Sequence, residues 1–300
     1  MIGRPPKSRK PKRRSIYMKE FSYISFIQQA LEVAECLPLK LSKYAQNTFS
    51  CRQLSILLII RQKLDFSYRR FVRFLEITKI PEMLNLKRIP NHSTLYKFAK
   101  RVGSKLIDRF LLATPVIKQH RVAIDATGFK INRQSDYMAL RFGIPTRFKH
   151  FAKTSIAVNA KTQQVLSVVV RKGPRNDNKD FFPVLRKVRG RILSVIADKG
   201  YDAKKNHEYV IRNLHAKSVI CVKGKNLSTH SRSTLRRKIL RNFDHKEYAK
   251  RNIAEMVFSI VKNCYGSRLR SRTIKMQRLE ILLKFIAYNL RRGCLLRLST

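Results

Sequence analysis

The spacing of apolar residues changes near residue 121, and this change constrains the fold more than any other feature of the chain. From Glu20 to about Leu112, apolar side chains recur every three or four residues, a spacing that predicts helices. We expect these helices over about 20–36, 50–64, 67–77 and 92–112. After residue 121 the chain holds short runs rich in Val and Ile, which predict strands. An all-helical N-terminal region is therefore expected to precede a region that contains a sheet.

The order of elements in the second region favours a mixed sheet. Strands are expected at 122–124, 155–158, 165–170, 192–197 and 218–222, and helices at about 179–188, 203–214 and 246–264. Three strands in succession favour an antiparallel meander, and the later alternation of strands and helices favours parallel crossovers. The fold class predicted is α/β, a mixed sheet flanked by helices, with a final apolar helix within 262–297.

The charge of the chain is strongly one-sided. Lys and Arg number 66 against 18 Asp and Glu, which gives a formal net charge of +48. An excess of this size favours a polyanionic partner such as nucleic acid. Hydrophobic residues make up 44% of the chain, a share typical of folded proteins, so the chain as a whole is not a disordered basic tail.

The first residues are predicted to form a flexible basic arm over 1–16. Residues 1–14 hold seven basic residues, three prolines and no acidic residue, a composition that cannot bury a core. Arg4 lies in an extended, proline-stiffened segment that could follow the minor groove of A·T-rich DNA. A solubilising tail is the alternative interpretation.

Several classes of protein are excluded by what the sequence lacks. The five cysteines have neither the spacing of zinc sites nor the framework of small secreted disulfide proteins. No apolar run approaches the roughly 20 residues that span a bilayer, and the N-terminus lacks the apolar segment of a secretory signal. We therefore expect no membrane partner and a cytoplasmic location.

The helical region, placed at 17–118, is expected to bind DNA. In its last predicted helix, the apolar residues form one stripe and leave a basic face. The cations of that face include Lys97, Lys100 and Arg101. Together with the preceding helix, this segment could form a helix-turn-helix in which 93–101 is the recognition element. An ordinary helical bundle with a solvated basic face is the alternative.

Two carboxylates stand out because acidic residues are so few. Asp125 follows the apolar run 122–124, and Asp198 follows the run 193–197, so each adjoins a predicted buried strand. A carboxylate in such a place is costly unless a cation or several hydrogen-bond donors meet it. Capping of a helix or a strand edge is the structural alternative for either residue alone.

A third carboxylate, Glu255, lies on a polar stripe of the helix predicted at 246–264. At about 100° per residue, one face of this helix carries Tyr248, Arg251, Glu255, Ser259 and Lys262. The apolar residues lie on the opposite side, so the polar stripe is expected to face a groove beside the sheet. A solvated, salt-bridged face would explain the polarity, but not its coincidence with two strand carboxylates.

These residues resemble a known family. The pattern Tyr248-x2-Arg251-x3-Glu255-x6-Lys262 resembles the YREK signature of prokaryotic insertion-sequence transposases of families four and five, in the DDE class. The segments 197–202 and 124–128 are similar to the second and first aspartate boxes of the same families.

The resemblance implies an RNase H-like DDE catalytic domain over 119–300. In such a domain Asp125, Asp198 and Glu255 would hold two Mg²⁺ ions, with Mn²⁺ able to substitute. Hard oxygen ligands suit these ions, and paired ions suit in-line displacement at phosphorus. Tyr248 and the cations Arg251 and Lys262 would hold phosphates and bases near the scissile bond.

The function implied is that of a DNA transposase, which cleaves the ends of an insertion sequence and joins the 3′-OH ends to target DNA. Its partners would be double-stranded DNA and a second copy of the chain, in a dimer at the prokaryotic nucleoid. An RNase H-like nuclease without strand transfer and a decayed, non-catalytic DNA-binding protein are the alternatives.

Other features bear on this interpretation. The chain has no Trp, which leaves open whether excision passes through a hairpin. The basic stretch 223–251 is expected to contact DNA. No two histidines have metal or triad spacing, so a catalytic histidine is not expected. Asp177 and Asp180 are interpreted as turn or helix-capping residues, with an auxiliary acidic role as the alternative.

Overall fold

The helical N-terminal region is present as predicted. The structure, a computed structural model, describes residues 22–41, 48–114, 119–131, 151–173, 176–222 and 234–298. The predicted arm with Arg4 lies outside these ranges. The helices of the first region are α1 (Tyr23–Ala34), α2 (Cys51–Lys63), α3 (Tyr68–Glu76), α4 (Ile80–Met83), α5 (His92–Arg101) and α6 (Ser104–Ala113).

The prediction of one helix over 92–112 is wrong, because two helices occupy this stretch. Helix α5 ends before Val102, and Gly103 precedes α6 in an extended conformation with φ −74° and ψ 152°. The chain already leaves the helix at Val102, with φ −58° and ψ 117°, and the poor helix propensity of glycine disfavours a continuation through Gly103. The apolar spacing continues across the break, which is why periodicity alone does not reveal it.

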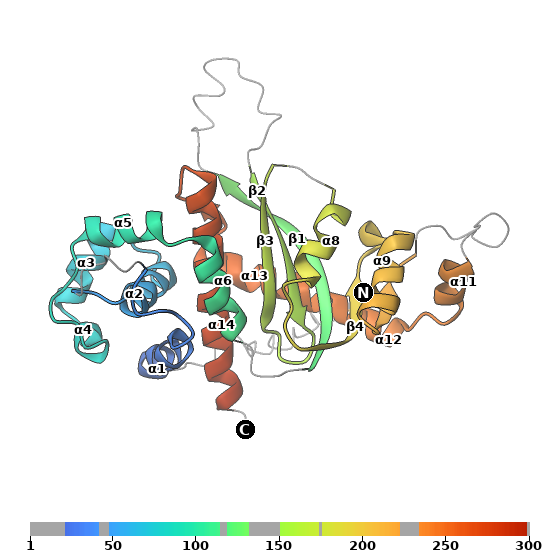
Figure 1. Ribbon diagram of the computed structural model, residues 1–300, viewed down its shortest axis with the longest axis horizontal. Helices are drawn as coiled ribbons and strands as arrows, with labels where there is room; N and C mark the ends of the chain where they lie inside the picture. The colour runs from blue at the N-terminus through green and yellow to red at the C-terminus, as the bar shows by residue number, and fades with distance from the viewer. Residues whose placement is uncertain are drawn as a thin grey trace, which may run out of the picture.

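The described strands form one mixed sheet, which confirms the predicted fold class (Figure 1). They are β1 (Gln119–Ile131), β2 (Phe151–Asn159), β3 (Val165–Lys172), β4 (Arg191–Ala197), β5 (Lys217–Ile220) and the short β6 (Arg268–Leu269). The order is β3-β2-β1-β4-β5, with β6 paired to the end of β1. The first three strands are antiparallel, and β4 and β5 run parallel to β1.

Helices of the second region follow the predicted order with one correction. They are α8 (Asn178–Leu185), α9 (Lys204–Glu208) with a π turn at Tyr209–Asn213, α11 (Thr234–Arg241), α12 (His245–Tyr248), α13 (Asn252–Tyr265) and α14 (Ile274–Arg297). The helix predicted over 246–264 is not continuous, because a 3-10 turn at Ala249–Arg251 separates α12 from α13. This tighter turn winds by three residues rather than 3.6, so Tyr248 is displaced from its position in an ideal helix.

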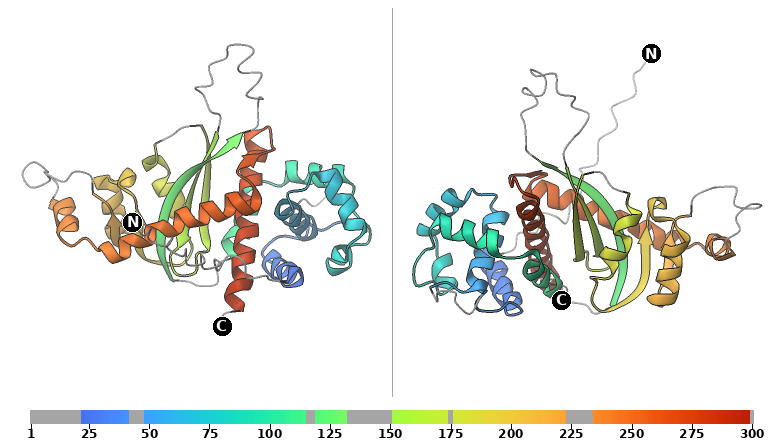
Figure 2. Two further views of the ribbon diagram at one scale, coloured as in Figure 1. Left: turned by 180° about the vertical axis from the view of Figure 1, so that it is seen from behind. Right: turned by 45° about the horizontal axis from the view of Figure 1, so that its top comes forward.

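The two faces of the sheet pack against different helices. Ala123 and Phe129 of β1 belong to the core that includes α13 and α14, whereas Val122 and Ile124 point to the other face and join a core with α8. Figure 2, left, shows α13 in orange crossing one face of the sheet. This alternation, expected for a strand buried on both faces, decides which side chains of β1 can meet α13.

Helix α14 joins the two regions. It is buried along most of its length and contacts α1, α2 and α6 on one side and β3 and α13 on the other (Figure 1). Buried Asn289 in this helix bonds to the backbone of Val165 and to the hydroxyl of Thr114. Within the described residues, no helix is long and apolar enough to cross a membrane.

Candidate active site at the edge of the sheet

The register of β1 against β4 places two carboxylates side by side. Ile124 pairs with Ala197 in this parallel ladder, so Asp125 and Asp198 follow at the next level. Asp125 also pairs with Ile156, which faces the α13 side of the sheet. Because paired residues point to the same face, Asp125 lies on the face that α13 covers. Asp198 follows the last paired residue of β4, and Tyr248, which precedes α13, contacts it at 3.5 Å.

Asp125 lies in a crowded and partly dry environment. Burial raises the pKa of its carboxyl to about 6, although the backbone N–H of Ala126 acts in the opposite direction. The negative charges of Glu255 and Asp177 contribute to this rise, and Arg251 opposes it. Like charges gathered around a half-buried carboxyl favour a cation in their midst.

Asp198 lies where β4 ends and a short turn begins. Its Oδ1 atom accepts a hydrogen bond of 2.6 Å from the backbone N–H of Lys199, the first residue of a 3-10 turn that ends at Tyr201. The Tyr248 hydroxyl donates to the same oxygen across 3.5 Å. Burial, with the charges of Cys221 and Asp198, raises the pKa of Tyr248 to about 12, so it keeps its proton.

Helix α13 presents Glu255 on its exposed side. The opposite side of the helix is buried through Ala254, Val257, Phe258, Val261 and Tyr265. This one-sided burial fixes the direction in which Glu255 points. The Glu255 carboxylate forms an ion pair of 2.5 Å with Arg251, four residues earlier in the chain.

Lys262 completes the group. Its Nζ atom donates a hydrogen bond of 2.6 Å to Oγ1 of Thr127, which lies two residues after Asp125 on the same face of β1. The ammonium also lies 5.6 Å from the centre of the Phe129 ring. Burial lowers the pKa of Lys262, and the nearby charge of Asp125 partly offsets this effect.

The donor set suits a hard divalent cation in kind, since such ions prefer carboxylate oxygens. In the part of the chain that the structure describes, no three His, Cys, Asp or Glu side chains are close enough together to hold a metal ion as they stand. Glu255 is turned to Arg251 rather than to the aspartates. The residues therefore fit a divalent cation in the chemistry of their oxygen atoms and in their position on one face of the sheet.

Asp177 and Asp180 play different parts at the start of α8. Asp180 is buried and accepts hydrogen bonds from Arg171, at 3.0 Å, and from the Ser155 hydroxyl, at 3.3 Å. Asp177 occupies the N-cap position but makes no capping hydrogen bond. Its carboxylate instead forms an ion pair of 2.5 Å with Lys153.

A buried polar network lies beside the second aspartate box. His207 bonds to Asp202 through Nε2 at 3.0 Å and to the Ser218 hydroxyl through Nδ1 at 2.9 Å, and Arg236 of α11 binds the same Asp202. The side chains of Asp202 and His207 have no exposed surface, so substrate cannot reach them. Sequence reasoning missed this network because its members come from separate elements, and only their burial among apolar strands could have signalled it.

The cations of α5 that are predicted to bind DNA lie apart from the acidic site. Lys97, Lys100 and Arg101 are exposed on α5, which packs against α3 with Tyr68 and Tyr96 in edge contact at 5.8 Å. In Figure 1, α5 and the sheet lie on opposite sides of α14. The structure therefore brings Tyr248, Arg251, Glu255 and Lys262 near the aspartates, but not the α5 cations.

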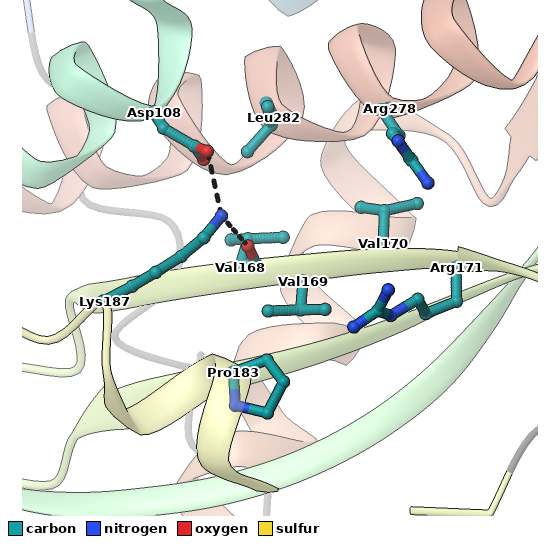
Figure 3. Close-up of a pocket in the computed structure, with 9 residues that line it drawn as sticks. All are labelled: Asp108, Val168, Val169, Val170, Arg171, Pro183, Lys187, Arg278 and Leu282. Atoms are coloured by element: carbon teal, nitrogen blue, oxygen red, sulfur yellow. Dashed lines mark hydrogen bonds and ion pairs between the residues drawn. The ribbon is translucent and has the colours of Figure 1, made fainter. Parts of the chain in front are cut away.

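A separate cavity of about 230 Å³ lies over β3, between α6, α8 and α14 (Figure 3). Its lining comprises Asp108, Val168, Val169, Val170, Arg171, Pro183, Lys187, Arg278 and Leu282. Lys187 donates to Asp108 at 2.8 Å and to the carbonyl of Val168 at 3.1 Å. This contact covers part of the outer edge of β3, and the cavity contains none of the site residues above.

The strand order defines an RNase H-like α/β fold, in which Asp125 of β1 and Asp198, at the carboxyl end of β4, lie on neighbouring inner strands of the sheet. The family model described as "Transposase DDE domain" matches residues 118–290, and the chain belongs to this family. A search of curated proteins found no significant match. Among solved structures, the piggyBac transposase synaptic complex with hairpin DNA matches with a TM-score of 0.46 and 10% identity, over 92% of this chain and 73% of that chain.

Family membership fixes the general function. The chain is a transposase, an enzyme that acts on DNA, and the family generally uses divalent metal ions.

Proposed function

We propose that this transposase cleaves DNA at the ends of an insertion sequence and joins the 3′-OH ends to target DNA. The β1–β4 register carries the proposal, because it sets Asp125, which lies on the face that α13 covers, beside Asp198. Glu255 projects from the same helix. Two Mg²⁺ ions are the proposed cofactor, and Mn²⁺ would substitute.

Asp125, Asp198 and Glu255 are the residues that would hold the ions. When bound, such ions activate the attacking oxygen and stabilise the leaving oxygen in an in-line displacement at phosphorus. Glu255 would first have to exchange its ion pair with Arg251 for the metal. The raised pKa of Asp125 is consistent with this role, because a cation would offset both the burial of its carboxylate and the repulsion from Glu255 and Asp177.

Tyr248, Arg251 and Lys262 are proposed to hold DNA next to the carboxylates. An arginine released from Glu255 is suited to bind a phosphate through two parallel hydrogen bonds. Lys262 is held at Thr127, near Asp125, and provides a positive charge at the same place. Their spacing supports membership in insertion-sequence families four and five.

The helical region is proposed to bind the transposon ends as double-stranded DNA. Lys97, Lys100 and Arg101 lie exposed on one helix, where they could contact successive phosphates. Arg4, in the N-terminal arm, would add minor-groove contacts. A homodimer that holds two ends is the proposed active form.

A cleavage assay tests the proposal. A labelled duplex that carries the DNA flanking the gene is incubated with Mg²⁺, Mn²⁺ or EDTA. We expect metal-dependent cutting by the wild type and, for Glu255→Gln, a loss of about a thousandfold in rate, since metal ligation contributes several kcal/mol to the transition state. Glu208→Gln, which alters a side chain of α9 paired with Lys204, is the matched control.

The outcomes separate the alternatives. Glu255→Gln should still bind the duplex in a gel-shift assay, and a variant that cuts at the wild-type rate would remove Glu255 from the active site. Cutting without joined products would indicate a nuclease without strand transfer. Binding without cutting under either metal would indicate a decayed, non-catalytic protein.

A further inference from the structure

Asp177 lies against the turn that carries Asp198, although the two are far apart in sequence. A Cβ atom built on Gly200, two residues after Asp198, would lie 3.5 Å from Oδ2 of Asp177. Asp177 is therefore a direct neighbour of the turn that follows Asp198 in the proposed catalytic group.

The Asp177 carboxylate is anchored on one side and open on the other. Its Oδ1 atom pairs at 2.5 Å with Lys153, whose side chain is only 6% exposed. The Asp177 side chain is itself 45% exposed. The buried Lys153 ammonium holds the Asp177 carboxylate in position. The exposed side of this carboxylate can still bind a ligand.

The Tyr201 hydroxyl provides an independent observation. Tyr201 is 2% exposed, and its hydroxyl has no hydrogen-bond partner among the described residues. Burial raises its pKa well above the usual value, and so do the negative charges of Asp177, Asp125, Asp180 and Asp198. The hydroxyl therefore lies in the electric field of these carboxylates. A buried donor left unpaired costs about 1–3 kcal/mol.

Asp180, three residues along, does not share this arrangement. Its two oxygens accept from Arg171 and from Ser155, and its side chain is 1% exposed. Asp180 thus has its partners within the protein. The two aspartates at the start of α8 differ in their freedom to bind a ligand.

We propose that Asp177 is a fourth metal-binding carboxylate of this site and that the buried Tyr201 hydroxyl donates to an oxygen of the hydrated ion. The inference rests on the proposed function, since it assigns a further ligand to the same ion. Asp177 would bind the ion from the start of α8, beside the turn at Gly200, whereas Glu255 would bind it from α13.

Direct binding of Mn²⁺ tests this proposal without any measurement of activity. The signal of free Mn²⁺ in electron paramagnetic resonance is followed as MnCl₂ is added to the full chain, with and without duplex DNA. We expect Tyr201→Phe, which alters a group next to the ligands, to weaken binding by about tenfold, at the low end of the range for such groups. Asp177→Asn removes a proposed ligand and should weaken binding by about a hundredfold.

Two variants serve as controls. Asp180→Asn removes a carboxylate of the same helix that is committed to Arg171, and Asp65→Asn removes an exposed one that pairs with Arg270. Both should bind Mn²⁺ as the wild type does. Melting curves in EDTA establish that each variant is folded. Should Asp177→Asn fail to fold, Tyr201→Phe decides the question, because it removes a single oxygen atom.

The failure of this inference differs from the failure of the proposed function. The role of Asp177 alone would be overturned if Asp177→Asn bound Mn²⁺ with wild-type affinity while Asp125→Asn bound it weakly. Where Tyr201→Phe is the deciding variant, wild-type affinity in that variant would have the same meaning. Absence of Mn²⁺ binding by the wild type, with DNA present, would overturn the metal site as a whole and this inference with it.

Discussion

The helical region and the edge of the sheet use charge in opposite ways. On α5, Lys97, Lys100 and Arg101 project into solvent, where salt screens them and each contributes little by itself. At the edge of the sheet, Asp125 is half-buried among other carboxylates and Asp202 is fully buried. The difference shows that the many exposed cations act together, each with a small effect. Each of the few acidic residues, in contrast, has a large effect that depends on its burial and its partners.

The strongest test of this contrast is the removal of a buried charge. Asp202→Ala leaves His207 and Arg236 without their shared carboxylate, and breaking a buried pair in this way costs about 3–5 kcal/mol. We expect a large fall in the midpoint of urea denaturation. Glu32→Ala, which removes the exposed partner of Arg297, should cost about 1 kcal/mol at most. Equal falls in the denaturation midpoint for the two substitutions would show that the buried and the exposed carboxylates contribute equally to stability.

A second test uses the pH dependence of stability. The Asp125 pKa is about 6 in the folded chain against 3.8 as the ordinary value. The folded protein therefore holds a proton that the unfolded chain loses, and wild-type stability falls as pH rises from about 4 through 6. Asp125→Asn lacks this penalty and should be more stable at pH 8 in EDTA by about 2–3 kcal/mol.

Melting temperatures at pH 5 and pH 8 check this expectation. The advantage of Asp125→Asn should be clearly smaller at pH 5, where the wild-type carboxyl keeps most of its proton. A variant that is less stable than the wild type at pH 8 would show that burial and the neighbouring negative charges do not destabilise the ionised Asp125 carboxylate.

The smallest effect is expected from the exposed cations. Replacement of Lys97, Lys100 and Arg101 by Ala should lower DNA affinity and reduce the slope of log K against log salt by about 2–3, at about 0.9 for each lost phosphate contact. Stability should change little, because these side chains are exposed. Fluorescence anisotropy at several salt concentrations provides the measurement.

A matched triple variant on α9 and its π turn controls for the loss of positive charge. Lys204, Lys205 and Arg212 are also exposed, so their replacement by Ala removes the same net charge. An equal loss of slope in both triple variants would mean that α5 is not the DNA-binding helix, only a part of a generally basic surface.

Much of the fold could be predicted from local patterns. The change of apolar period near residue 121 separates the helical region from the sheet, and the order of strands and helices predicts its mixed character. Local patterns failed at Gly103 and at 249–251, where the chain leaves one helix and starts another. The apolar spacing continues across both breaks, so periodicity alone predicts one continuous helix at each place.

The sequence by itself determined which residues could carry the chemistry, because scarce carboxylates beside apolar runs and the spacing from Tyr248 to Lys262 are local properties. Only the tertiary structure decided which of them meet. The β1–β4 register sets Asp125 beside Asp198, and the packing of α8 brings Asp177 to the turn at Gly200. The physical reason is that such contacts depend on strand pairing and helix packing between distant segments, which no local pattern encodes.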